Sequence, residues 1–207
     1  MDHKVSPSVR GLLLNGEWVM GDGPRVQVRD KYKLDTFAEV TAADEAQVRM
    51  AVDAAHAAFR RGAPVAYERG QILDRAAQLL QARIDDFVHT MQCEAGFTES
   101  DAAGEVRRCM QTLALSAEEA RRLAGDVIPL AGAPGAAGRM GFTLRVPLGV
   151  VAAITPFNSP LNTVAHKVAP AFAAGNAVVL KPSSFTPLTA CRLAEVLQEA
   201  GLPHGFL

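Results

Sequence analysis

Two polar side chains, those of Asn158 and Lys181, follow short and mostly apolar stretches of the chain. Residues 150–155 have no polar face, which is typical of a strand buried on both sides in a parallel sheet, and residues 176–180 predict a second buried strand. In such sheets, ligands bind beyond the carboxyl ends of the strands. We therefore expect both side chains at a ligand-binding edge, where the Asn158 amide could donate hydrogen bonds to a developing oxyanion.

Two predicted helices would hold this edge in place. Residues 160–174 follow the first strand, and Gly175 suits the left-handed position after a helix C-terminus. Pro187 suits the first turn of a second helix, which should run to Gly201. The order strand, helix, strand, helix predicts a right-handed βαβ unit, and hence an α/β fold.

Both polar residues also have ordinary structural interpretations. Asn158 could be the N-cap of the helix that follows it, because its side chain could accept a hydrogen bond from a free backbone N–H. A lysine at the end of a strand usually extends a solvated ammonium group from a buried stem. Residue type and position alone therefore leave the roles of Asn158 and Lys181 open.

The chain before residue 150 predicts β structure followed by three helices. Asn15-Gly16 between apolar flanks predicts a type I′ hairpin over residues 12–19, and residues 26–40 should prolong the same β layer. The first helix should follow an N-cap within residues 41–44, reach Arg60, and bury one apolar face. The residues expected on that face are Val48, Val52, Ala55 and Phe59.

A longer helix is expected over residues 69–95, ending at Gly96. Its expected core contacts are Ile72, Ala76, Leu79, Phe87 and Met91. A third helix, capped by Ser100 or Asp101, should run through Ala124. The glycine-rich residues 132–141 are interpreted as a linker loop, because neither a strand before them nor a helix after them gives the context of a phosphate loop. Residues 140–146 then alternate as a strand.

Composition excludes several classes of protein. The chain has 207 residues, a net charge of -1 and 49% hydrophobic residues, which suits a globular domain and gives no support for nucleic-acid binding. No apolar run approaches the ~20 residues that span a bilayer, so we expect no membrane partner. The three cysteines have neither paired nor metal-ligand spacing, so we expect no metal and a reduced, cytoplasmic location.

Two stretches resemble the aldehyde dehydrogenase superfamily, with weaker similarity over nearly the whole chain. They are P-L-G-V-V-A-A-I-T-P-F-N-S-P-L (residues 147–161) and A-A-G-N-A-V-V-L-K-P-S-S (residues 173–184). The resemblance implies that residues 1–207 are an incomplete N-terminal, Rossmann-like cofactor-binding domain with an N-terminal β hairpin and helices. It implies NAD(P)-dependent oxidation of an aldehyde to a carboxylic acid in the complete enzyme.

The resemblance also implies roles for residues at the predicted edge. Asn158 matches the family's oxyanion-binding asparagine, whereas Thr155, Pro156 and Phe157 match residues that lie along the cofactor. Lys181 matches the lysine that contacts the adenosine ribose of the cofactor, within the motif Lys181-Pro182-Ser183-Ser184. Ser184 stands where NAD-preferring relatives often carry glutamate. Serine removes the repulsion against a 2′-phosphate, so either NAD or NADP is expected as cofactor.

A further set of residues is expected to bind the substrate. One helix face would carry Ser159, then Asn162 or Thr163, and then His166, because residues three or four apart are neighbours on a helix. In the family, this face lines the aldehyde tunnel, and Arg108 best matches the residue that an earlier helix contributes. A guanidinium beside hydroxyls and an imidazole suits a small polar or anionic aldehyde. The alternative is that Arg107 and Arg108 pair with Glu105 or with other acidic residues.

Residues with the nucleophile and base roles are not found in the sequence, because the family's cysteine and glutamate lie downstream of the K-P motif. Cys191 falls within a predicted helix and is interpreted as a small core residue. We expect the chain to end where the family begins its next strand. The alternative function is a truncated, non-catalytic module that binds cofactor or joins subunits. In the family, a strand matching residues 139–146 belongs to the arm that joins subunits, so a homo-oligomer is expected when the enzyme is complete.

Overall fold

A βαβ unit forms the C-terminal part of the chain in the computed structural model, which describes residues 8–207. Strands β8 (Val150–Ile154) and β9 (Ala177–Lys181) pair in parallel, with Ile154 opposite Lys181. Helix α5 (Asn162–Ala173) connects them, and α6 (Pro187–Glu199) follows β9. Gly175 has a φ of 87°, the left-handed conformation expected after a helix. The predicted α/β unit is confirmed.

The expectation that residues 150–155 are buried on both sides is wrong. Ala153 is buried, whereas Ala152 and Ile154, on the opposite face, are exposed. No other element of the described residues covers the side chains of Ala152 and Ile154 on this face. The apolar residues 150–155 therefore include an exposed face that another layer could cover.

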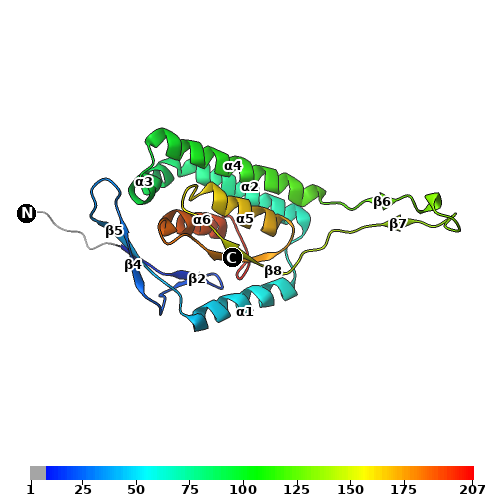
Figure 1. Cartoon of the computed structure of the whole chain (residues 1–207), viewed down its shortest axis with the longest axis horizontal. Coiled ribbons are helices and arrows are strands. Elements are labelled where there is room, and N and C mark those ends of the chain that lie inside the picture. Colours follow the sequence, from blue (N-terminus) through cyan, green and yellow to red (C-terminus); the bar gives the residue numbers. More distant parts are fainter. Residues whose placement is uncertain (1–7) are drawn as a thin grey trace, which may run out of the picture.

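Helices α2 (Ala66–Ala82), α3 (Ile84–Ala95) and α4 (Glu99–Arg122) form a layer against α5 and α6 (Figure 1). The single helix predicted over residues 69–95 is wrong, because the chain breaks at Arg83, with φ −115° and ψ 22°. The break lets Leu80 and Phe87, on different helices, enter the same core. Of the expected contacts on these helices, four are buried and Leu79 is partly buried; the four are Ile72, Ala76, Phe87 and Met91.

The N-terminus of α4 differs from its prediction by two residues. Thr98 is the N-cap, and its Oγ1 accepts a hydrogen bond from the Asp101 backbone N–H at 3.1 Å. Ser100 and Asp101 therefore lie inside the first turn rather than capping it. Asp101 places a carboxylate there, which the helix dipole favours.

Helix α1 (Glu45–Arg61) begins at Asp44 with a capping box that includes Gln47, as the N-cap signal within residues 41–44 predicts. Its buried face matches the predicted one only in its C-terminal half, because Val48 and Val52 are exposed. The other two predicted contacts hold, since Ala55 is buried and Phe59 is partly buried, and Ala58 is buried as well. The C-terminal segment approaches so closely that a Cβ on Gly205 would lie 2.8 Å from that of Ala58, so only small residues fit there.

The N-terminal β structure consists of two separate sheets. The hairpin β2 (Leu12–Leu14) and β3 (Glu17–Val19) turns at Asn15-Gly16, where both φ angles are positive (48° and 86°), as a type I′ turn requires. Strands β1 (Ser8–Arg10), β5 (Thr36–Thr41) and β4 (Arg25–Arg29) form the other sheet in that order. The expected single β layer is therefore wrong, because β1 and β4 occupy both edges of β5.

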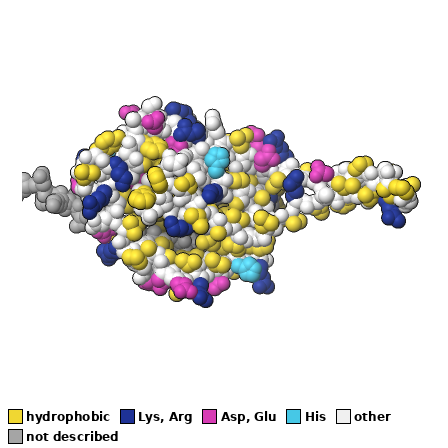
Figure 2. Space-filling model, viewed as in Figure 1, with side chains coloured by type: hydrophobic (Ala, Val, Ile, Leu, Met, Phe, Trp, Pro, Cys, Tyr) yellow, Lys and Arg dark blue, Asp and Glu magenta, His cyan; other side chains and the backbone are white. Residues whose placement is uncertain are grey.

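A narrow arm projects from the helical body (Figure 1). Its short strands β6 (Val127–Ile128) and β7 (Gly141–Phe142) pair antiparallel, and the one-turn helix η1 (Leu130–Gly132) and glycine turns form its tip. Only two residues of the strand predicted over 140–146 are regular. Exposed apolar side chains run along the arm (Figure 2), among them Phe142, Leu144 and Val146.

Candidate functional site

The buried carboxylate of Glu105 on α4 accepts hydrogen bonds from Arg108, Ser159 and Asn162. Glu105 is 0% exposed. Its Oε2 accepts a hydrogen bond from Arg108 Nη2 at 2.6 Å. Its Oε1 accepts bonds from the backbone N–H of Asn162, at 2.9 Å, and from the hydroxyl of Ser159. Glu105 therefore connects α4 to the segment that enters α5.

A hydroxyl on α4, one turn beyond Arg108, extends this cluster. Thr112 Oγ1 lies 2.8 Å from Asn162 Oδ1 and 3.5 Å from His166 Nε2. Arg108, Ser159 and His166, predicted from separate parts of the sequence, are thus gathered where α4 packs on α5. Thr163 is half-buried on α5, and its backbone N–H bonds the Ser159 carbonyl at 3.1 Å.

The alternative interpretation of the two arginines is correct for Arg108, which pairs with Glu105. Arg107 forms no ion pair with the acidic residues that the structure describes. The pairing does not consume the Arg108 guanidinium, because 56% of its side chain stays exposed while the Glu105 side chain is 1% exposed. Most of its N–H donors can still meet an anion.

Asn158 does not cap the helix. Helix α5 begins at Asn162, with Leu161 as the N-cap residue and no side-chain cap. Asn158 lies four residues earlier and is exposed. The capping alternative is therefore wrong, and the Asn158 amide remains open for a ligand role.

The expected cofactor residues lie at the carboxyl ends of β8 and β9. The Thr155 backbone N–H donates to the Lys181 carbonyl at 3.2 Å, which places the two segments side by side. Pro156, Lys181 and Ser184 are exposed. Ser183 is buried, and its Oγ accepts a bond from the Phe185 N–H at 3.1 Å.

Two features of this edge fit a nucleotide cofactor. The Thr155 hydroxyl is buried and has no hydrogen-bond partner among residues 8–207, so a polar group could still be satisfied there. Phe157 and Phe185 are exposed and meet edge to face, with ring centroids 5.5 Å apart. Exposed aromatic surface beside the exposed Lys181 and Ser184 is a surface on which apolar and polar parts of a nucleotide could both bind.

The sequence did not assign three residues that the structure places at these regions. Glu105 and Thr112 lie in the cluster between α4 and α5, and Phe185 lies at the edge formed by β8 and β9. Glu105 was considered only as a partner that would neutralise an arginine. Its position could have been found from helical spacing, because Ala102, Val106 and Cys109 on the same helix are buried around it. The contacts from Ser159 and Asn162 depend on tertiary packing and had no sequence signal.

The described cysteines are poor nucleophiles. Burial raises the pKa of the Cys191 thiol to about 12 and that of Cys93 to about 11. Burial also raises the pKa of Cys109, with a further contribution from the neighbouring Glu105 carboxylate. Neutral thiols do not attack carbonyl groups efficiently. The raised pKa of Cys191 is therefore consistent with its interpretation as a packing residue.

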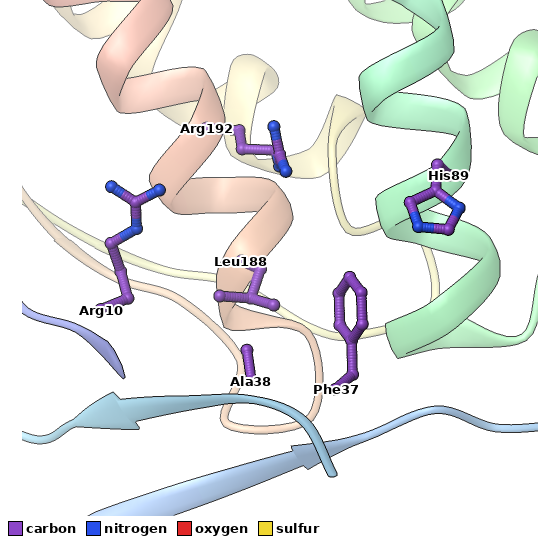
Figure 3. A pocket seen from close by; sticks show the side chains of 6 residues that line it. All are labelled: Arg10, Phe37, Ala38, His89, Leu188 and Arg192. Atoms are coloured by element: carbon purple, nitrogen blue, oxygen red, sulfur yellow. The ribbon is translucent and has the colours of Figure 1, made fainter. Parts of the chain in front are cut away.

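A separate cavity of about 260 Å³ lies between β5, α3 and α6 (Figure 3). Arg10, His89 and Arg192 surround it, and Phe37 and Leu188 provide apolar lining. It contains none of the predicted site residues. The Arg10 guanidinium is already paired with Glu195 and lies over the Trp18 ring.

The aldehyde dehydrogenase family model matches residues 18–207. Together with the α/β fold and the edge described above, this match shows that the chain belongs to the aldehyde dehydrogenase family. Among residues 8–207, no helix has both the length and the apolar composition needed to cross a membrane.

Three relatives illustrate the similarity. A 3-sulfolactaldehyde dehydrogenase of Priestia aryabhattai is 46% identical over 197 residues, covering 95% of this chain and 41% of the relative. Aldehyde dehydrogenase 21 of Physcomitrella patens, solved with its reaction product succinate, is 39% identical with a TM-score of 0.92, over 98% of this chain and 42% of that one. An NADP-dependent glyceraldehyde-3-phosphate dehydrogenase of Bacillus halodurans, solved with NADP, is 32% identical with a TM-score of 0.90, over 95% and 42%. The chain thus spans about two fifths of the length of these relatives.

Proposed function

We propose that residues 1–207 are the N-terminal part of an enzyme that oxidises a small anionic aldehyde to a carboxylic acid with NAD or NADP. The observation that carries this proposal is the half-exposed Arg108 guanidinium, which shares the Glu105 carboxylate with Ser159 and lies on the helix whose Thr112 meets His166. The three relatives described above support it, because they are named for a sulfonated aldehyde, solved with a dicarboxylate product, and named for a phosphorylated aldehyde, respectively. A guanidinium can bind each of these anionic groups with paired hydrogen bonds.

At the other end of the substrate, we assign the exposed Asn158 amide to the aldehyde oxygen. The Asn158 amide has two N–H donors, and the next residue, Ser159, is bonded to the buried Glu105. These donors could stabilise negative charge on the aldehyde oxygen as it develops. When bound, the nicotinamide cofactor supplies the hydride acceptor that oxidation requires. The nucleophile and the base are expected on other residues of the complete enzyme, because the described cysteines are buried, neutral thiols.

For the cofactor, we assign the edge formed by the ends of β8 and β9. Its proposed contacts are Thr155, Pro156, Phe157, Lys181, Ser183 and Ser184. Ser184 carries no charge that would repel a 2′-phosphate, which is consistent with use of NADP as well as NAD. A structural neighbour solved with NADP supports this choice.

The test is substitution of Arg108 by methionine in the complete enzyme. We expect KM for succinic semialdehyde to rise about 10- to 100-fold, the loss of one charge-assisted interaction of ~1.5–3 kcal/mol. KM for butanal, a neutral aldehyde of equal length, should change less than about threefold, because no charge is recognised. Arg107→Met, on the same helix, is the matched control. Equal effects on both aldehydes, or a wild-type preference for long alkyl aldehydes, would show that Arg108 does not bind the substrate.

A second candidate function applies to residues 1–207 acting alone. The exposed apolar arm, with Phe142, Leu144 and Val146, favours a subunit-interaction module, because such surface is normally covered in an assembly. In this reading the chain binds cofactor or a second subunit and has no turnover. In the first reading the same arm would join the subunits of a homo-oligomer. A cytoplasmic location remains a prediction from cysteine usage.

A further inference from the structure

The Glu105 carboxylate accepts three hydrogen bonds at the candidate site. It is completely removed from solvent, and three donors compensate its buried charge. A buried carboxylate without such donors would cost several kcal/mol, so its position and those of its donors are strongly coupled. Movement of one partner must be transmitted to the others.

The two oxygens of this carboxylate serve different ends of the proposed substrate. Oε2 orients the guanidinium of Arg108, the proposed anchor for the anionic group. Oε1 holds the Ser159 hydroxyl and the Asn162 N–H, and Ser159 is the residue directly after Asn158, the proposed oxyanion donor. A single rigid planar group therefore connects the anchor for one end of the substrate to the segment that binds the other end.

We propose that Glu105 is a positioning residue that determines substrate length, by fixing the separation between Arg108 and Asn158. This inference rests on the proposed function, since it assigns a substrate end to each of those two residues. An anionic aldehyde with the matching number of carbons reaches both groups at once. A shorter or longer one satisfies only one of them, and loses the benefit of simultaneous orientation.

Glutamine cannot replace glutamate in this arrangement. Both carboxylate oxygens accept, whereas a glutamine side chain has one acceptor oxygen and one NH₂ group that only donates. If the NH₂ group faces Arg108, two donors oppose each other. If the NH₂ group instead faces Ser159 and Asn162, it opposes the Asn162 N–H. Glu105→Gln therefore releases one of the two connections in either orientation while nearly preserving side-chain volume.

The experiment compares malonic, succinic and glutaric semialdehydes on the complete enzyme. We expect the wild type to favour one length by at least about tenfold in kcat/KM, the scale on which one methylene group is discriminated. Glu105→Gln should reduce that ratio to below about threefold. The matched control is Glu119→Gln, because Glu119 lies on the same helix and pairs with Arg122 three residues later, but is exposed. This control should keep the wild-type ratio.

Each other outcome decides against the inference. An unchanged length ratio in a Glu105→Gln enzyme with an unchanged melting temperature overturns it, as does equal loss in the Glu119→Gln control. A wild type that prefers anionic aldehydes of every length equally overturns this inference and leaves the proposed function standing. A wild type with no preference for anionic over neutral aldehydes overturns both.

A second variant covers the case in which Glu105→Gln does not fold. Ser159→Ala removes only the hydroxyl bond to Oε1, at a half-buried position. It should lower the length ratio part of the way, with a smaller change in KM for the anionic group than Arg108→Met produces. If Ser159→Ala leaves the length ratio at its wild-type value, Glu105 does not set the separation through this loop.

Discussion

Helices α5 and α6 begin without a side-chain cap of their own, and each receives a buried carboxylate from another helix. At α6, the Thr186 side chain makes no cap bond, and Glu94 of α3 accepts from the backbone N–H groups of Leu188 and Thr189, at 2.9 and 2.7 Å. At α5, Leu161 cannot cap, and Glu105 of α4 accepts from the Asn162 N–H. Negative charge at a helix N-terminus is favoured by the helix dipole and by its free N–H groups.

The donors to the two carboxylates differ in their exposure to solvent. All three bonds to Glu94 come from α6, including one from the Thr189 hydroxyl, and Glu94 and Thr189 are each 0% exposed. Glu105 shares its charge with Arg108, which is half exposed. The same capping arrangement is thus closed at α6 and open to solvent at α5. We expect loss of Glu94 to affect mainly stability, and loss of Glu105 to affect mainly specificity.

The largest expected effect comes from Glu94→Ala. It leaves two backbone N–H groups and a hydroxyl buried without an acceptor, and each such group costs about 1–3 kcal/mol. We expect the free energy of unfolding to fall by about 3–4 kcal/mol, measured by urea unfolding of the chain. Glu105→Ala should cost about 2 kcal/mol, because Arg108 can be solvated once released. Equal losses would contradict the distinction between closed and open surroundings.

The sequence was sufficient where structure depends on neighbours along the chain. The hairpin turn at Asn15-Gly16 and the βαβ unit over residues 150–199 form as predicted, because turn chemistry and apolar runs are local signals. The break at Arg83 has no glycine or proline to mark it and is imposed by packing. The exposed Val48 and Val52 show the same limit, since apolar type alone does not decide which face meets the core.

The candidate site was predictable in its members more than in its connections. The structure brings Arg108, Ser159 and His166 to the junction of α4 and α5, while their roles remain predictions. Helical spacing could have indicated that Glu105 is buried, but its bond to Ser159 had no sequence signal, and an acidic residue on a helix is normally exposed. Glu94 was missed for the same reason. Buried charge is determined by donors that are distant in sequence, and these become visible only in the fold.

The second prediction uses the pH dependence of stability to compare the two carboxylates. Burial raises the pKa of Glu94 above its usual 4.5, and the bonds from Thr189 and Leu188 oppose that rise without cancelling it. A carboxyl group with a raised pKa in the folded state contributes stability that is fully present below pH 4.5. That contribution is lost as the pH rises through the folded-state pKa.

The measurement is the free energy of unfolding of the wild type minus that of Glu94→Gln, followed upward from pH 4. We expect this difference to fall by about 1.4 kcal/mol for each unit by which the pKa is raised, because glutamine does not titrate. Glu105→Gln, treated in the same way, serves as the comparison at the open carboxylate. A difference for Glu94→Gln that is constant, or that grows with pH, would contradict the effect of burial.

The smallest expected effects come from removing one hydroxyl at each carboxylate. Thr189→Val preserves side-chain shape and removes the hydroxyl donor to Glu94, where solvent cannot replace it. Ser159→Ala removes the corresponding donor to Glu105, which keeps Arg108 and the Asn162 N–H. We expect losses in the free energy of unfolding of about 1 kcal/mol for Thr189→Val and about 0.5 kcal/mol for Ser159→Ala, by urea unfolding. A larger loss for Ser159→Ala would mean that the α5 junction is as closed as the α6 junction, and that Glu105 has the packing role here assigned to Glu94.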